Sequence, residues 1–149
     1  MLRHSLTDDD YKKLLAFRTG LRQFLRWSEQ SAERLGIPPA QHQLLLAVRG
    51  HANKAGPTIG ELSGYLLSQQ HSVSELVQRA SEAGLVERHQ DPKDRRISRI
   101  QLTKKGGDAL ELLSAMHLEE LSRLASEMSG LWEGLNFEPR KSTASSLKT

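Results

Sequence analysis

Apolar residues recur at intervals of three and four along the first quarter of the chain, and this period predicts a long helix over residues 8–35. Leu14 and Leu21 lie on this apolar stripe. Thr7, which precedes three aspartates, suits the N-cap, and Gly36 suits the C-terminal stop. A helix of about 28 residues is about 40 Å long, more than the diameter of a small domain. We therefore expect a second chain to cover part of the stripe.

Three shorter helices are predicted next. Pro39 suits the first turn of one, and its apolar run at 44–48 is expected to be buried on all sides. Thr58 and Glu61 have the spacing of a capping box, which begins a short second helix. The third helix is predicted over residues 69–83. Two short helices joined by a tight connection have the order of a helix-turn-helix motif.

Gly84 ends that third helix, and the period then changes from helical to alternating, which predicts a β-hairpin. Ile100 and Leu102 share one face of its return strand, and polar residues take the other. From Lys93 to Lys105 there are six basic residues and one acidic residue, a local charge of +5. The whole chain has a net charge of only +3, so the remainder is net negative. Positive charge concentrated on a projecting hairpin favours contact with a polyanion such as nucleic acid.

The last part of the chain predicts another long helix, which Thr103 caps and which carries leucines at helical spacing. The period loosens around residues 126–129, so we expect a separate short helix over residues 131–137. Residues 138–149 are polar and aperiodic and are expected to form a flexible tail.

These elements predict one mainly α domain with a small β-wing over residues 8–137, preceded by a lead of residues 1–7. A lobe at about 38–103 is flanked by the long helices at about 8–35 and 104–137. The order of elements is that of a winged helix-turn-helix. In that architecture the second helix of the motif, the recognition helix, enters the major groove of double-stranded DNA, and the wing tip reaches the neighbouring minor groove. The long helices would pair two subunits into a homodimer.

Composition excludes several other classes of protein. The chain of 149 residues has no cysteine, which excludes disulfides and thiolate metal sites. It has no apolar run of membrane-spanning length and no N-terminal apolar signal core, so we expect a cytoplasmic protein without membrane contact. It also lacks a Gly-rich phosphate loop and a nucleophile–base pair at recognisable spacing. We therefore expect no enzymatic activity and no cofactor.

Several segments resemble the MarR family of bacterial and archaeal transcription regulators. The most specific is the wing, Asp91-Pro92-Lys93-Asp94-Arg95-Arg96, with the trailing Leu102-Thr103-Lys104-Lys105-Gly106. Residues 58–62, 71–79 and 83–88 also match, and the resemblance covers about residues 8–137. It implies a homodimeric regulator, usually a repressor, that binds DNA. It also implies that a small, often aromatic or anionic, effector changes the affinity for the operator.

The candidate DNA-contacting residues occupy two places. On the recognition helix they are side chains that can reach base edges or phosphates, namely Gln69, Gln70, His71, Ser72, Ser74, Gln78 and Arg79. On the wing they are Lys93, Asp94, Arg95 and Arg96. The resemblance implies that Arg96 enters the minor groove and that Asp94 orients a neighbouring guanidinium.

In proteins that resemble this chain, the first, second and fifth helices flank the effector pocket, which makes Trp27, His42 and His117 candidates for it. Two alternatives stay open. The uncharged start of the recognition helix favours a winged-helix module that binds protein instead of DNA. A metal-responsive regulator would use His42 and His117 with Glu119 or Glu120, but a zinc site needs three or four ligands, and no metal is expected.

Overall fold

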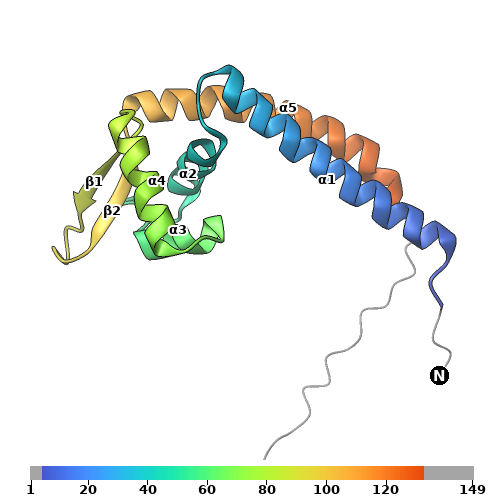
Figure 1. Cartoon of the computed structure of the whole chain (residues 1–149), viewed down its shortest axis with the longest axis horizontal. Coiled ribbons are helices and arrows are strands. Elements are labelled where there is room, and N and C mark those ends of the chain that lie inside the picture. The colour runs from blue at the N-terminus through green and yellow to red at the C-terminus, as the bar shows by residue number, and fades with distance from the viewer. Residues whose placement is uncertain (1–4, 133–149) are drawn as a thin grey trace, which may run out of the picture.

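The computed structural model describes residues 5–132 and is mostly helical, with one two-stranded antiparallel sheet. Its elements are α1 (Asp8–Arg34), α2 (Pro39–Gly50), α3 (Ile59–Leu66), α4 (Gln70–Glu82), β1 (Val86–Gln90), β2 (Ser98–Leu102) and α5 (Lys104–Trp132). Figure 1 shows a lobe that contains α2, α3, α4 and the hairpin, and an arm in which α1 lies beside the second half of α5. The predicted mainly α fold with a β-wing is confirmed.

The arm leaves much of its apolar surface uncovered. At the start of α1, the Thr7 hydroxyl accepts a hydrogen bond from Asp10 N at 3.2 Å and the Asp10 carboxylate accepts one from Thr7 N at 2.8 Å, which completes a capping box. Further along, Leu15 on α1 and Leu118 on α5 are each 68% exposed. None of the helices in residues 5–132 combines the length and the apolar character that a bilayer-spanning helix needs.

α5 is longer and more regular than the sequence pattern indicated. It continues without interruption to Trp132, so the expected break after residues 126–129 and the separate helix beginning at residue 131 are wrong. Backbone hydrogen bonds can continue a helix through a stretch in which the apolar period is weak. Residues 133–137, the rest of that predicted helix, and the predicted tail at 138–149 lie outside the described residues.

The core of the lobe surrounds α2. Its main buried apolar residues are Leu44, Leu45, Val48, Leu62, Val73, Val77, Ala80, Leu85, Val86, Ile100 and Leu110. The α3 helix begins with the predicted capping box, in which Glu61 N donates to the Thr58 hydroxyl at 3.2 Å. The α4 helix begins at Gln70 because Gln69 is its N-cap, one residue later than predicted. Together, α3 and α4 form the helix-turn-helix.

The turn between α3 and α4 depends on Leu67. This residue ends α3 in the left-handed conformation, with φ 50° and ψ 42°, a region that side chains with a Cβ seldom adopt. Its side chain is 92% exposed, so burial within this chain does not offset the backbone cost.

The trailing Leu-Thr-x-x-Gly motif joins the wing to α5. The Thr103 hydroxyl donates to the Gly84 carbonyl oxygen at 2.5 Å and accepts from Gly106 N at 3.0 Å, which confirms it as the cap of α5. A Cβ on Gly106 would lie 2.0 Å from the Leu85 carbonyl oxygen, so only glycine permits this close approach. The base of the hairpin is therefore fixed to the first turn of α5.

Candidate nucleic-acid interface

The first part of the candidate interface is the outer face of α4. Val73, Val77 and Ala80 are buried on the inner face, so the other positions point away from the core. All the predicted recognition-helix residues lie on α4 or at its N-cap, and all are exposed except Ser74, which is half-buried. The first turn holds no acidic residue and Gln69 makes no capping hydrogen bond, so the backbone N–H groups of this end can reach an external acceptor.

Among residues 5–132, side-chain pairing on α4 leaves Gln70 and Ser72 of its first turn unpaired. Glu75 lies 3.9 Å from Arg79 Nη2, the predicted i,i+4 pair, and 3.4 Å from His71 Nε2. Gln70 and Ser72 make no side-chain hydrogen bond to any residue that the structure describes. Their amide and hydroxyl groups are therefore free to contact a partner such as a base edge.

The second part of the interface is the wing turn, whose shape depends on Asp91. Its Oδ1 atom accepts hydrogen bonds from Lys93 N at 2.7 Å and Asp94 N at 3.0 Å. Its Oδ2 atom accepts one from Arg99 Nε. The Arg99 hydrogen bond, followed by that from Lys93, holds the pKa of Asp91 below its ordinary value. The carboxylate therefore stays charged and keeps the turn ordered at neutral pH.

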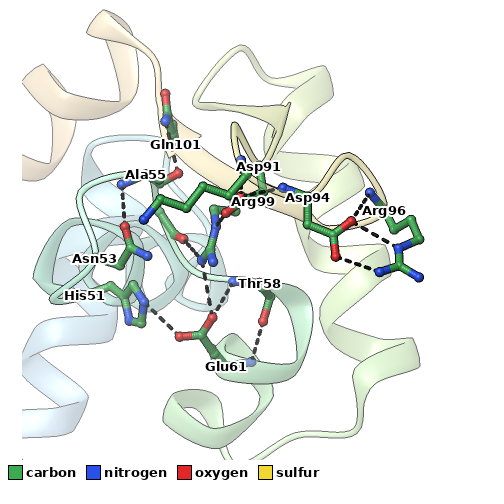
Figure 2. Close-up of polar contacts among 12 residues, drawn as sticks. His51, Asn53, Ala55, Thr58, Glu61, Asp91, Asp94, Arg96, Arg99 and Gln101 are labelled. Atoms are coloured by element: carbon green, nitrogen blue, oxygen red, sulfur yellow. Dashed lines mark hydrogen bonds and ion pairs between the residues drawn. The ribbon is translucent and has the colours of Figure 1, made fainter.

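The wing tip presents three cations. The Asp94 carboxylate accepts two hydrogen bonds from the Arg96 guanidinium, each 3.1 Å long (Figure 2), and these hold the pKa of Asp94 below its ordinary value. Arg96 remains 91% exposed despite this pairing. Lys93 and Arg95 are exposed and have no ion-pair partner within residues 5–132. The tip is thus a compact positive surface, and its contact with DNA stays a prediction.

The local charge counted along the sequence is divided in space. Arg99 is not an exposed cation, because its side chain is only 14% exposed and lies between Asp91 and Glu61 (Figure 2). Lys104 lies at the opposite end of the hairpin, at the start of α5, and pairs with Asp108 at 2.8 Å. The ion pairs of Arg99 with Asp91 and Glu61 were not predicted from the sequence. The alternation of residues along a strand does not show which segment of the chain covers a given face of that strand.

A separate aromatic cluster forms where α1, α2 and α5 meet. The structure brings the three predicted pocket residues together, with the His117 ring centroid 4.8 Å from those of Trp27 and His42. His117 Nδ1 donates to the Leu113 carbonyl oxygen, and its Nε2 shares a 2.6 Å hydrogen bond with the Ser28 hydroxyl. Burial, with a smaller contribution from His117, lowers the pKa of His42, which is therefore neutral at pH 7.

The cluster does not form a metal site. Nowhere in residues 5–132 do three His, Cys, Asp or Glu side chains come close enough to hold an ion together. Both ring nitrogens of His117 already have hydrogen-bond partners, and Glu120 pairs with Arg123. The ligand set proposed for a metal-responsive regulator is therefore not assembled.

Comparisons with known proteins agree with this fold. A family model described as "MarR family" matches residues 35–97. Two HTH-type transcriptional regulators of Bacillus subtilis are similar in sequence. YsmB is 45% identical over 49 residues, which cover 33% of this chain and only 34% of YsmB. YkoM is 26% identical over 135 residues, which cover 87% of this chain and 84% of YkoM.

Solved structures extend the similarity to most of the chain. The MarR family transcription regulator SP03579 matches with a TM-score of 0.66 and 25% identity over 78% of this chain and 76% of that one. The S. aureus MepR–DNA complex matches with a TM-score of 0.64 and 23% identity over 83% of this chain and 85% of that one. The helix-turn-helix and its hairpin thus define a winged helix-turn-helix protein. Residues 35–97 thus resemble the MarR family of transcription regulators in sequence, and most of the chain shares the fold of such a regulator.

Proposed function

We propose that this protein is a homodimer that binds a palindromic operator and regulates transcription as a repressor. In this proposal, α4 of each subunit enters the major groove and the wing tip grips the adjacent minor groove. Two half-sites about one helical turn apart would roughly double the base readout of a single helix.

The observation that carries the proposal is the shared direction of the two candidate surfaces. The N-terminal end of α4 and the wing tip both lie on the side of the lobe away from α5 (Figure 1). One surface offers free amide and hydroxyl groups with open backbone N–H groups, and the other offers the cations Lys93, Arg95 and Arg96. Base readout and phosphate attraction are thus available on the same side of the lobe. This arrangement favours DNA over a protein partner.

The exposed arm supports a homodimer. Leu14, Leu15 and Leu25 on α1, and Leu118 and Leu121 on α5, are all exposed. Exposed leucines gathered on two neighbouring helices favour an interaction site, and a second copy presents the same helices to cover them. We expect the double variant Leu15→Glu/Leu118→Glu to shift the protein from dimer to monomer in light scattering coupled to gel filtration. A dimer that survived both changes would place the interface elsewhere.

DNA binding is tested by fluorescence anisotropy with duplexes selected from a random pool. We expect Arg96→Ala to weaken binding about tenfold or more, because an inserted guanidinium would be lost. The control Lys12→Ala removes an exposed cation at the far end of the arm and should leave the affinity unchanged. A wild-type chain that enriched no sequence, or whose binding did not respond to salt, would refute the proposal.

We also propose that a small aromatic or anionic effector binds beside Trp27, His42 and His117 and changes DNA affinity. The support is the convergence of one indole and two imidazoles between the arm and the lobe. Trp27 fluorescence then reports occupancy, with Trp132→Phe as the background to remove the other tryptophan. A ligand that altered Trp27 emission and left the operator affinity unchanged would separate binding from regulation.

A further inference from the structure

Three successive residues of β2 hold the loop that precedes α3. Ile100 N donates to the Pro57 carbonyl oxygen at 2.9 Å. On either side of it, Arg99 Nη1 donates to the Gly56 carbonyl oxygen at 2.9 Å and Gln101 Nε2 donates to that of Ala55 at 3.0 Å. The loop therefore lies along β2 and joins the wing to the start of the helix-turn-helix (Figure 2).

The fit between the loop and β2 leaves no free space at Gly56. Its φ is +97°, and an added Cβ would lie 1.9 Å from the Ile100 carbonyl oxygen. A backbone held this closely cannot slide along the strand without breaking the hydrogen bonds to both neighbours.

The Arg99 guanidinium connects the wing turn to α3. On one side it donates to Asp91, whose other oxygen organises the wing turn. On the other side Arg99 Nη1 lies 3.6 Å from Glu61 Oε1, in the first turn of α3. The Glu61 carboxylate also lies 2.8 Å from His51 Nε2, and this contact links the end of α2 to Glu61. One half-buried cation thus joins the wing, α2 and α3 in a polar network.

We propose that Arg99 is a positioning residue that sets the orientation of the wing tip relative to α4 and does not contact DNA itself. This inference rests on the proposed DNA-binding function. A two-stranded hairpin is only marginally stable where no other element packs against it. The base of this hairpin packs into the core through Val86 and Ile100, so loss of the brace would loosen the wing tip beyond that base. Binding would then select the minor fraction in which tip and α4 both reach the duplex.

The test compares Arg99→Met with Arg95→Met, a matched control at an exposed cation of the wing tip. If the brace is lost and about a tenth of the wings remain correctly oriented, the apparent Kd of a dimer that needs both wings rises about a hundredfold. The number of phosphates neutralised does not change, so the slope of log K against log salt should stay at the wild-type value for Arg99→Met. For Arg95→Met, loss of a phosphate contact would make the slope shallower by about 0.9 for each subunit of the dimer. A shallower slope for Arg99→Met would show that Arg99 contacts phosphate, and would overturn the inference.

A double-mutant cycle with Arg96→Ala separates positioning from a general loss of structure. If Arg99 acts through the wing tip, Arg99→Met should weaken binding much less when Arg96 is already absent. Equal weakening in both backgrounds would refute the proposal.

Arg99→Lys keeps the charge but cannot bridge Asp91 and the Gly56 carbonyl oxygen together, so it should behave like Arg99→Met. Wild-type DNA affinity in Arg99→Lys would show that the positive charge is sufficient without the bridging guanidinium, and it would overturn the inference.

Hydrogen exchange tests the brace without DNA. We expect Arg99→Met to increase exchange across residues 91–102 and to leave α4 protected as in the wild type. If Arg99→Met does not fold, Gln101→Ala, which removes only the hydrogen bond to Ala55, should show a smaller increase over the same residues. Unchanged exchange in the wing would overturn the inference. If the wild-type chain bound no DNA, the proposed function would be refuted. Hydrogen exchange would still show whether Arg99 orders the wing.

Discussion

The same substitution, glycine to alanine, should have opposite effects at two positions of the lobe. At Gly56 the φ of +97° is unfavourable for alanine, and the new methyl group would lie 1.9 Å from the Ile100 carbonyl oxygen. At Gly64, which is exposed in the interior of α3, an added Cβ meets nothing within 4 Å. The pair therefore separates close packing and backbone conformation from intrinsic helix propensity.

The magnitudes follow from the local geometry. Forcing alanine into the left-handed region costs about 1–2 kcal/mol. Displacing the loop also weakens its hydrogen bond from Ile100, a further ~1 kcal/mol or more. We expect Gly56→Ala to lower the free energy of unfolding by about 2–4 kcal/mol. Gly64→Ala should raise it by up to about 1 kcal/mol, because alanine is the better helix former.

Thermal unfolding followed by circular dichroism measures both effects. For a chain of this size 1 kcal/mol corresponds to about 2–4 °C in Tm, so Gly56→Ala should lower Tm by about 5–15 °C and Gly64→Ala should raise it by about 2–4 °C. All variants must be compared at one protein concentration, because the proposed dimerisation would make Tm depend on it. A Tm for Gly56→Ala at or above the wild-type value would refute the close contact between the loop and β2.

Two further predictions concern Leu67 and His42. Leu67→Gly should raise the free energy of unfolding by up to about 1 kcal/mol in a urea titration, because it relieves a left-handed leucine whose side chain is 92% exposed; a loss of stability would show that the side chain has a partner. Since the pKa of His42 is lowered from 6.5, the unfolded chain takes up this proton first as the pH falls below 6.5, and the folded state loses stability from there down to the lowered pKa. His42→Gln should therefore reduce the fall in Tm between about pH 7 and about pH 5, and an unchanged pH profile would contradict the burial of a neutral imidazole.

The elements could be predicted because their ends carry local signals. The Thr58–Glu61 capping box and the glycines that follow α1 and α4 act within a single turn of the chain. Gly36 and Gly84 both have positive φ, as helix-terminating glycines commonly do. The predicted starts of α1, α2, α3, α4 and α5 therefore agree with the structure to within one residue, whereas the separate helix predicted at 131 does not exist.

The role of Arg99 could not be predicted because it depends on segments distant in sequence. Strand alternation placed Arg99 opposite Ile100, on a face that could equally have been solvated. The loop at 55–57 and the carboxylate of Glu61 cover that face only in the folded lobe. The end of α5 was predicted wrongly for a related reason. Apolar spacing indicates which side chains pack against other elements, but it does not show whether the backbone hydrogen bonds of a helix continue.

β2 of the wing and α5 are separated in the chain by Thr103 alone. α5 then continues as one uninterrupted helix of 29 residues, about 43 Å along its axis, whose second half belongs to the arm. A tilt of about 5° at the far end of such a lever would move the hairpin by about 4 Å, comparable to the rise of one base pair. In a dimer, small changes in how the two arms cross would therefore alter the span between the wings, and so the operator length that both subunits can bridge.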